Sequence, residues 1–150
     1  MKIKVVDGSI SAVLTLISGV PDFKQPYGAT EFQRRSNSPF FKILIGQINE
    51  ESVGFKVGYD RYQNQKTYYS WMGGVLPEYR NKGVAAALQL ELESWCKQQG
   101  FTQLRFKTRN NHVKMIHFGV KNGFYLVDLE KKSSPQDNRL WFEKELLKDI

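Results

Sequence analysis

Hydrophobic and polar side chains alternate with a period of two along much of the chain, which is typical of half-buried strands. Clusters of Gly, Pro, Asn and Ser separate these runs, as expected for turns. Strands are therefore predicted at Lys2–Val6, Phe40–Ile48, Val53–Tyr59, Thr67–Leu76, Thr102–Thr108, Phe124–Leu129 and Leu140–Leu146.

Other segments place their hydrophobic residues at helical spacing. Helices are predicted at Ser9–Ile17, with Ser9 as N-cap, and at Pro26–Arg35, Gly83–Gly100 and His112–Asn122. In the longest of these helices the inward face is formed by Val84, Ala85, Leu88, Leu92 and Trp95. In the last helix the inward positions are expected to be Val113, Ile116 and Val120.

The order of these elements predicts a mixed α/β fold. Most neighbouring strands are joined by short turns and should pair antiparallel. The passage from Thr67–Leu76 through the long helix to Thr102–Thr108 instead requires a parallel pair with a right-handed crossover. We therefore expect one domain over residues 1–150, with a mostly antiparallel sheet of about six to seven strands, a central parallel pair and about four helices.

Composition narrows the class of protein. The 150 residues are 41% hydrophobic and 25% charged, which excludes an intrinsically disordered chain. Lys and Arg exceed Asp and Glu by 22 to 15, and this excess favours anionic partners. No RNP1-like run occurs, so nucleic acid is not an expected partner.

The single Cys96 indicates a reducing compartment, expected to be the cytoplasm. No window of the sequence approaches 18 apolar residues, so no membrane association is expected.

The segment from Gly73 to Ala85 carries the clearest chemical signal, because a strand end passes through a turn into the strongest predicted helix. N–H groups of a first helical turn lack intrahelical partners and carry partial positive charge, so they bind phosphate well. Arg80 and Lys82 add formal charge, and Gly83 permits close approach. The alternative interpretation is a structural turn with solvated basic residues. The chain contains neither the G-x-x-x-x-G-K-(S/T) motif of ATP-binding proteins nor the G-x-G-x-x-G motif of NAD-binding proteins.

The segment resembles the acyl-CoA signature of the GNAT superfamily of N-acetyltransferases, V-x-P-x-x-(Q/R)-x-x-G-x-(G/A). Every fixed position is met, by Val75, Pro77, Arg80, Gly83 and Ala85. A downstream block, Asn110 and then Lys121-Asn122-Gly123-Phe124, is similar to a second GNAT motif. The resemblance implies acetyl-CoA as co-substrate and a strand pair splayed at its site. The residues implied to bind it are Val75, Leu76, Arg80, Asn81, Lys82, Gly83, Val84, Ala85 and Asn110, with Asn111 as the alternative to Asn110.

The resemblance also implies how the thioester is activated. Backbone N–H groups near Gly74, Val75 and Leu76 would support its carbonyl, on a strand that the pair Gly73-Gly74 allows to bulge. Many relatives place a tyrosine that protonates the leaving thiolate four residues before the helix-ending glycine. That position is Gly119 here, so the usual general acid is missing.

The expected function is transfer of acetyl from acetyl-CoA to a primary amine, of a small molecule or a peptide, by direct nucleophilic attack. The alternative is a non-catalytic acyl-CoA- or peptide-binding module, which Gly119 favours. No metal site is expected, since His112 and His117 have no convergent ligands. No general base is assigned, because Glu31, Asp60 and Glu78 lie outside any motif. Assembly as a homodimer is left open.

Overall fold

The computed structural model describes residues 2–23 and 28–147. The strands are β1 (Ile3–Asp7), β2 (Lys42–Ile48), β3 (Glu51–Tyr59), β4 (Thr67–Val75), β5 (Gln103–Arg109), β6 (Tyr125–Glu130) and β7 (Arg139–Glu145). The helices are α1 (Ile10–Ser18), α2 (Ala29–Ser36), α3 (Val84–Gln98) and α4 (Val113–Lys121), with short 3-10 turns at Pro77–Tyr79 and Pro135–Asp137. The predicted elements are thus confirmed. The predicted start of the second helix at Pro26 lies outside the described residues.

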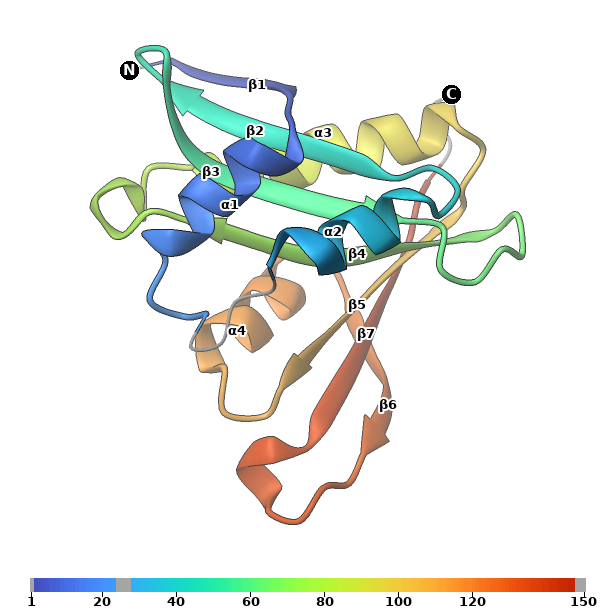
Figure 1. Cartoon of the computed structure of the whole chain (residues 1–150). Helices are drawn as coiled ribbons and strands as arrows, with labels where there is room; N and C mark the ends of the chain where they lie inside the picture. Colours follow the sequence, from blue (N-terminus) through green and yellow to red (C-terminus); the bar gives the residue numbers. More distant parts are fainter. Residues whose placement is uncertain (1, 24–27, 148–150) are drawn as a thin grey trace.

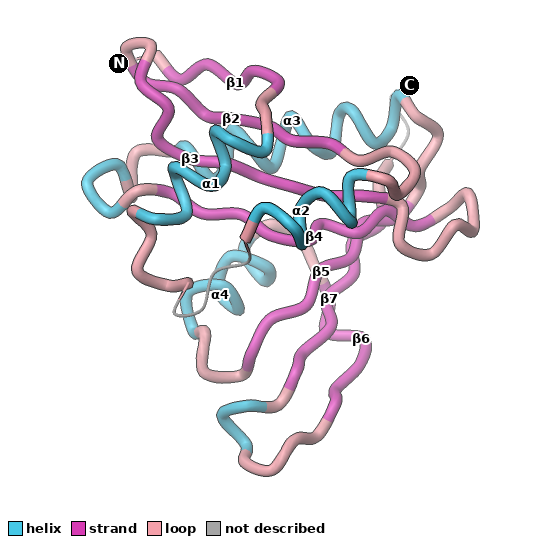
Figure 2. Tube along the Cα trace, viewed as in Figure 1, coloured by secondary structure: helices cyan, strands magenta, loops and turns pink. Residues whose placement is uncertain are grey.

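The described strands form one sheet in the order β1-β2-β3-β4-β5-β7-β6, antiparallel except for the β4–β5 pair. Helices α1 and α2 cover one face of the sheet, which is the near face in Figure 1, and α3 lies behind it (Figures 1 and 2). The mixed α/β fold with a central parallel pair is therefore confirmed. Among the described residues no helix is long and apolar enough to cross a membrane.

The core has two main parts because strand side chains point alternately to the two faces. On β3, Phe55 and Val57 pack with α1 residues. Val53 packs with residues of α3 instead, because the β2–β3 register shifts at this point and leaves Val53 unpaired between Ser52 and Gly54. Two local signals fix the ends of helices next to this core. The Ser9 hydroxyl accepts the Ala12 N–H at 3.2 Å and so caps α1. Gly100 has φ +95° and ends the α3 region, which few other residues could do.

Strands β4 and β5 pair only over a short stretch and then diverge. Their register joins Thr67–Tyr69 to Gln103–Arg105, and no later pair is formed. We call the divergence beyond Tyr69 and Arg105 the splay. A bulge in β4 lies at the start of the splay, because Ser70 and Met72 pair with successive β3 residues and leave Trp71 between them. The splayed pair is therefore confirmed, whereas the bulge lies at Trp71 and not at Gly73-Gly74.

The orientation of α4 differs from the prediction. Val113 is 59% exposed and Val120 is 64% exposed, so these two predicted inward positions are wrong. The third predicted position, Ile116, is partly buried against the core and is confirmed. The partly buried Met115 and the buried Gly119 complete the inward face. Both valines lie on one face because seven residues make about two turns, and the packing of Gly119 turns that face to solvent.

Candidate active site

The turn between β4 and α3 presents a row of backbone donors. Asn81 and Gly83 have φ +62° and +92°, and the first intrahelical bond of α3 runs from the Ala87 N–H to the Gly83 carbonyl at 3.0 Å. The N–H groups of Val84 to Ala86 therefore have no partner within the helix. Gly83 is exposed and has no side-chain cap, so these donors face solvent.

The charge around this turn suits an anion such as the pyrophosphate of acetyl-CoA. The first turn of α3 contains no acidic residue, and Lys82 next to it is exposed. Val84 is buried and anchors the turn in the core. Ala85 is small and exposed, so its predicted inward position is wrong. The positive end of the helix dipole and the donors act in the same direction, so the residues present fit the group.

Arg80 holds the turn and is not a free cation. Its Nε donates to the Val75 carbonyl at 3.2 Å, and its guanidinium pairs with Asp22, after α1, at 2.6 Å. Partial burial opposes ionisation of Asp22, but the Arg80 hydrogen bond and charge prevail and lower its pKa. The Arg80 N–H donates to Pro77. The structure thus places Arg80 at the predicted site, where it joins the end of β4 to the α1 side.

The hydrogen-bond pattern of β4 decides which N–H groups face the splay. The Leu76 N–H donates to the Val53 carbonyl at 2.8 Å, so it is committed to β3 and the expectation that it supports the thioester carbonyl is wrong. The assignment of Leu76 to the cofactor site stays a prediction. In an antiparallel pair, N–H groups alternate between the partner strand and the opposite side. Gly74 therefore also points its N–H to β3, whereas Gly73 and Val75 direct theirs into the splay.

Gly119 does not face the splay. A Cβ at this position would lie 2.8 Å from Cζ of Phe106 and 3.5 Å from Cδ1 of Phe142. These two rings are stacked with centroids 5.0 Å apart. A tyrosine side chain at position 119 would therefore meet the Phe106 ring first.

Lys56 on β3 was missed from the sequence. Its side chain is 8% exposed, and its Nζ lies 5.4 Å from the Phe118 ring centroid. Lys56 pairs with Gly73, and a Cβ on Gly73 would lie 3.8 Å from Nζ. Burial lowers the pKa of Lys56 to about 8, although Glu93 opposes this. The available signal was one charged residue in the middle of the otherwise apolar run Val53–Tyr59.

Asn110 lies at the turn between β5 and α4. Its side-chain amide donates to the Pro135 carbonyl at 3.2 Å, and its N–H donates to Asn138 at 2.9 Å. The neighbouring Asn111 N–H donates to Gln136. Both residues therefore join this turn to the β6–β7 connection, and the assignment of Asn110 to the cofactor stays a prediction.

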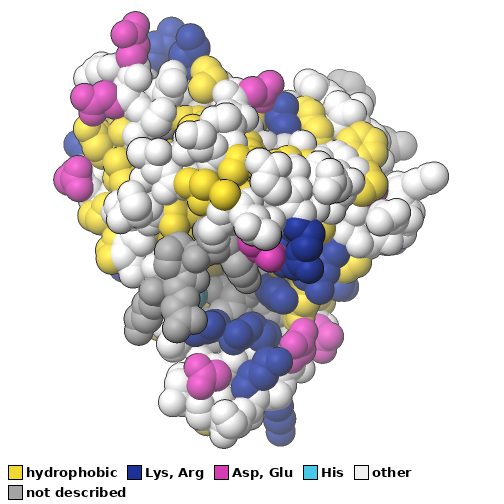
Figure 3. Space-filling view, in the orientation of Figure 1, with side chains coloured by type: hydrophobic (Ala, Val, Ile, Leu, Met, Phe, Trp, Pro, Cys, Tyr) yellow, Lys and Arg dark blue, Asp and Glu magenta, His cyan; other side chains and the backbone are white. Residues whose placement is uncertain are grey.

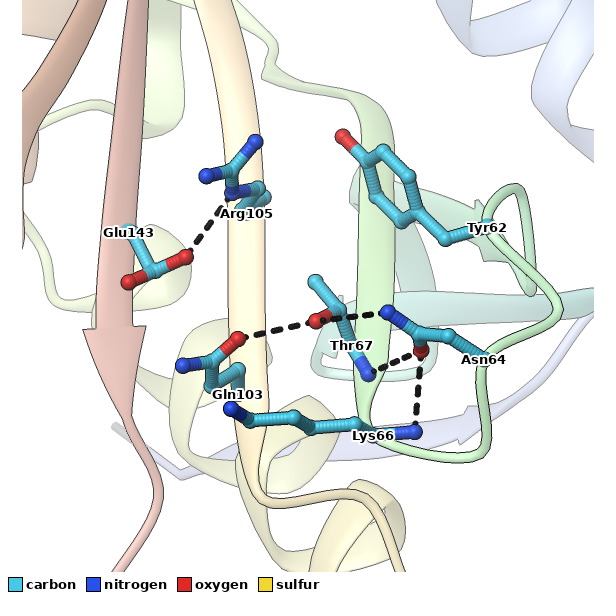
Figure 4. Close-up of a pocket in the computed structure, with 7 residues that line it drawn as sticks. All are labelled: Tyr62, Asn64, Lys66, Thr67, Gln103, Arg105 and Glu143. Atoms are coloured by element: carbon cyan, nitrogen blue, oxygen red, sulfur yellow. Dashed lines mark hydrogen bonds and ion pairs between the residues drawn. The ribbon is translucent and has the colours of Figure 1, made fainter.

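A polar hollow of about 250 Å³ lies where β4 and β5 are still paired. Figure 4 shows that its lining groups bond to one another: Thr67 Oγ1 donates to Gln103 at 2.9 Å, and Arg105 pairs with Glu143 at 2.9 Å. This hollow is not part of the splay. Within residues 2–23 and 28–147, no three His, Cys, Asp or Glu side chains gather as metal ligands would.

Comparisons with known proteins agree with this geometry. Residues 14–124 match the model of the acetyltransferase (GNAT) family. A protein named as an acetyltransferase from Pectobacterium atrosepticum is 28% identical over 120 residues, which cover 78% of this chain and 82% of that protein.

Two solved structures share the fold at low sequence identity. The ribosomal-protein-S18-alanine N-acetyltransferase of Escherichia coli has a TM-score of 0.82 and 12% identity, with 99% of this chain and 97% of that chain covered. A GNAT family acetyltransferase from Elizabethkingia anophelis, with acetyl-CoA bound, has a TM-score of 0.76 and 16% identity, with 96% and 98% covered.

Proposed function

The chain belongs to the acetyltransferase (GNAT) family, and we propose that it transfers acetyl from acetyl-CoA to a primary amine by direct nucleophilic attack. The observation that carries this proposal is the alignment of two sets of backbone donors. One set is the first turn of α3, beginning at Gly83, and the other is the splayed edge of β4 at Gly73 and Val75. Together they suit a pyrophosphate followed by a thioester.

Each set of donors has a separate task in the proposed reaction. The N–H groups from Asn81 to Ala85 hold the pyrophosphate, and Lys82 adds charge. The Val75 N–H holds the pantetheine arm, to which Asn110 contributes. The Gly73 N–H polarises the thioester carbonyl and stabilises the negative charge that develops on its oxygen. Acetyl-CoA supplies the acetyl group as an activated thioester.

We assign Lys56 as the group that protonates the leaving thiolate. As the amine nitrogen bonds to the carbonyl carbon and the C–S bond breaks, the Lys56 ammonium gives one proton to the sulfur and later regains one from water. The amine loses its extra proton to solvent. A donor with pKa about 8 is well matched to a thiol, whose ordinary pKa is about 8.5.

No carboxylate is assigned as base. Glu31 pairs with Arg34 and Arg35, at 2.6 and 2.8 Å, and Asp60 accepts the Gln63 N–H. Glu78 lies exposed in the turn before Arg80. The acceptor therefore enters as the neutral amine. Turnover should rise with pH up to about pH 8 as the amine loses its proton, until Lys56 begins to lose its own.

The proposal is tested by thiol release from acetyl-CoA with a panel of primary amines, with the acetylated product identified by mass. Release that requires both an amine and acetyl-CoA supports it. Acetyl-CoA binding without release from any amine would instead favour the non-catalytic acyl-CoA-binding module. Failure to bind CoA or acetyl-CoA would contradict both functions.

The role of Lys56 is tested with a matched pair of variants. In the wild type, kcat should fall as pH rises above about 8, because Lys56 loses its proton. Lys56→Met should lower kcat about 100-fold and abolish this fall. Lys42→Met is the control, because Lys42 on β2 also lies over an aromatic ring, Trp95, at 5.2 Å. An unchanged kcat and pH profile for Lys56→Met would contradict the assignment.

Location and assembly remain proposals. We propose a cytoplasmic location, since Cys96 is a free, buried thiol and burial raises its pKa.

A homodimer would use β6, a sheet edge where Tyr125 is 78% exposed and Leu126 is 55% exposed. Large apolar groups on an open edge favour pairing with another strand, and sedimentation would report it.

A further inference from the structure

Four cations gather beside the splay, on the sheet face that carries α1 and α2. We call Arg35, Arg61, Lys107 and Arg139 the cationic patch. Three of them rest on aromatic rings: Arg35 lies 4.5 Å from the centroid of Trp71, and Arg61 and Lys107 lie 5.3 and 5.2 Å from that of Trp141. Figure 3 shows Lys and Arg side chains concentrated on this face. Stacking of this kind fixes where the charges lie.

The patch borders the splay from both sides. Trp71 on β4 and Lys107 on β5 each lie two residues beyond the last β4–β5 pair, Tyr69 and Arg105. Side chains alternate along β5, so Lys107 points opposite to Phe106, which packs in the α3 part of the core. The patch therefore faces away from α3, on the side where an acceptor can approach without displacing the cofactor.

The charges of the patch are only partly neutralised. The pKa of Lys107 is lowered, first by burial and then by the charges of Arg61, Arg139 and Arg35. The carboxylate of Glu130 on β6 opposes this shift. Arg35 pairs with Glu31 at 2.8 Å, yet its Nε is buried without a hydrogen-bond partner. Glu130 accepts the Trp141 Nε1–H at 2.7 Å. Like charges held this closely repel, and an anion between them would relieve the repulsion.

We propose that the cationic patch binds a carboxylate or phosphate group of the amine acceptor, so that the acceptor is an anionic amine. This inference rests on the proposed acetyltransferase function and names its substrate class. Arg35 already donates to the Tyr59 hydroxyl and pairs with Glu31, and Arg139 donates to the Asp137 carbonyl. The direct contact with the anionic group is therefore assigned to Lys107 and Arg61, and the other two residues add positive charge. Polyamines and aminoglycosides, which carry several positive charges, would be repelled from the same place.

The test compares acceptors with and without the anionic group, and kcat/KM is referred to the concentration of the neutral amine because the anionic group also raises the pKa of the amine. Phenylalanine is paired with phenylalaninamide for a carboxylate, and O-phosphoserine with serine for a phosphate. We expect kcat/KM to be about tenfold higher for at least one anionic member, as the loss of a charged hydrogen bond implies. Lys107→Gln should reduce that ratio several-fold. Lys4→Gln, which removes an exposed charge on β1, should leave it unchanged.

A binding measurement separates failure of this inference from failure of the proposed function. N-acetylphenylalanine and its amide, the unreactive products, are titrated into the CoA-bound protein by calorimetry. Tighter binding of the carboxylate, lost in Lys107→Gln, supports the patch even if no amine is turned over. Equal binding of the two, equal kcat/KM within each acceptor pair, or a preference for a polyamine would overturn the inference, whatever the rate of acetyl transfer.

Discussion

A lysine in a protein interior makes stability depend on pH, and Lys56 should do so here. Its pKa falls from 10.5 to about 8 on folding, so between these values the unfolded chain binds more protons and stability rises with pH. The shift corresponds to about 3 kcal/mol. Unfolding by denaturant at pH 7 and pH 10.5 should show this gain in the wild type and not in Lys56→Met. Equal pH dependence in both proteins would show that Lys56 is not held in a desolvated site.

Single residues also explain why the sequence could predict the geometry of the turn before α3 but not the environment of Lys56 or Arg80. Gly83 and Ala85 lie in a local motif, and their backbone geometry depends on neighbours in the chain. Lys56 acquires its role from Gly73 and Phe118, which are distant in sequence. Arg80 matched the motif, but only the fold reveals that its charge is already paired with Asp22.

At the scale of elements, helix α4 tests whether packing outweighs helix propensity. Replacing a helical glycine by alanine ordinarily gains up to about 1 kcal/mol. At Gly119 the new Cβ would lie 2.8 Å from Cζ of Phe106, whose ring packs between Phe124 and Phe142. Overpacking costs about 1–3 kcal/mol, so Gly119→Ala should lower the free energy of unfolding by about 1 kcal/mol. A stabilised variant in denaturant unfolding would show that the ring moves aside freely.

Helix α4 also shows what the hydrophobic pattern of the sequence could not predict. The spacing of apolar residues predicted where each strand and helix lies, because the period is set by the local backbone. The inward face of α4 was wrong, since hydrophobicity favoured Val113 and Val120 whereas the Phe106 ring requires Gly119 beneath it. The bulge was predicted at Gly73-Gly74 but lies at Trp71, because the pairing of β4 with β3 determines its position.

At the scale of the whole molecule, the proposed amine acceptor and acetyl-CoA approach the splay from opposite faces of the sheet. The turn proposed to bind phosphate, at the start of α3, and the buried Lys56 lie on the face with α3, whereas the cationic patch lies on the face with α1 and α2. The splay joins the two faces because β4 and β5 are paired only at one end. An acceptor and acetyl-CoA can thus bind at once, which direct attack requires.

Calorimetric titration of CoA into the wild type, Gly83→Asp and Lys82→Ala tests the central claim most directly. Gly83 has φ +92°, so aspartate there strains the turn and also faces the pyrophosphate with a negative charge. We expect the wild type to bind CoA and Gly83→Asp to reduce the affinity about 100-fold or more. Lys82→Ala should reduce it only a few-fold, since backbone donors do most of the binding. Equal losses in the two variants, or no CoA binding by the wild type, would contradict the central claim.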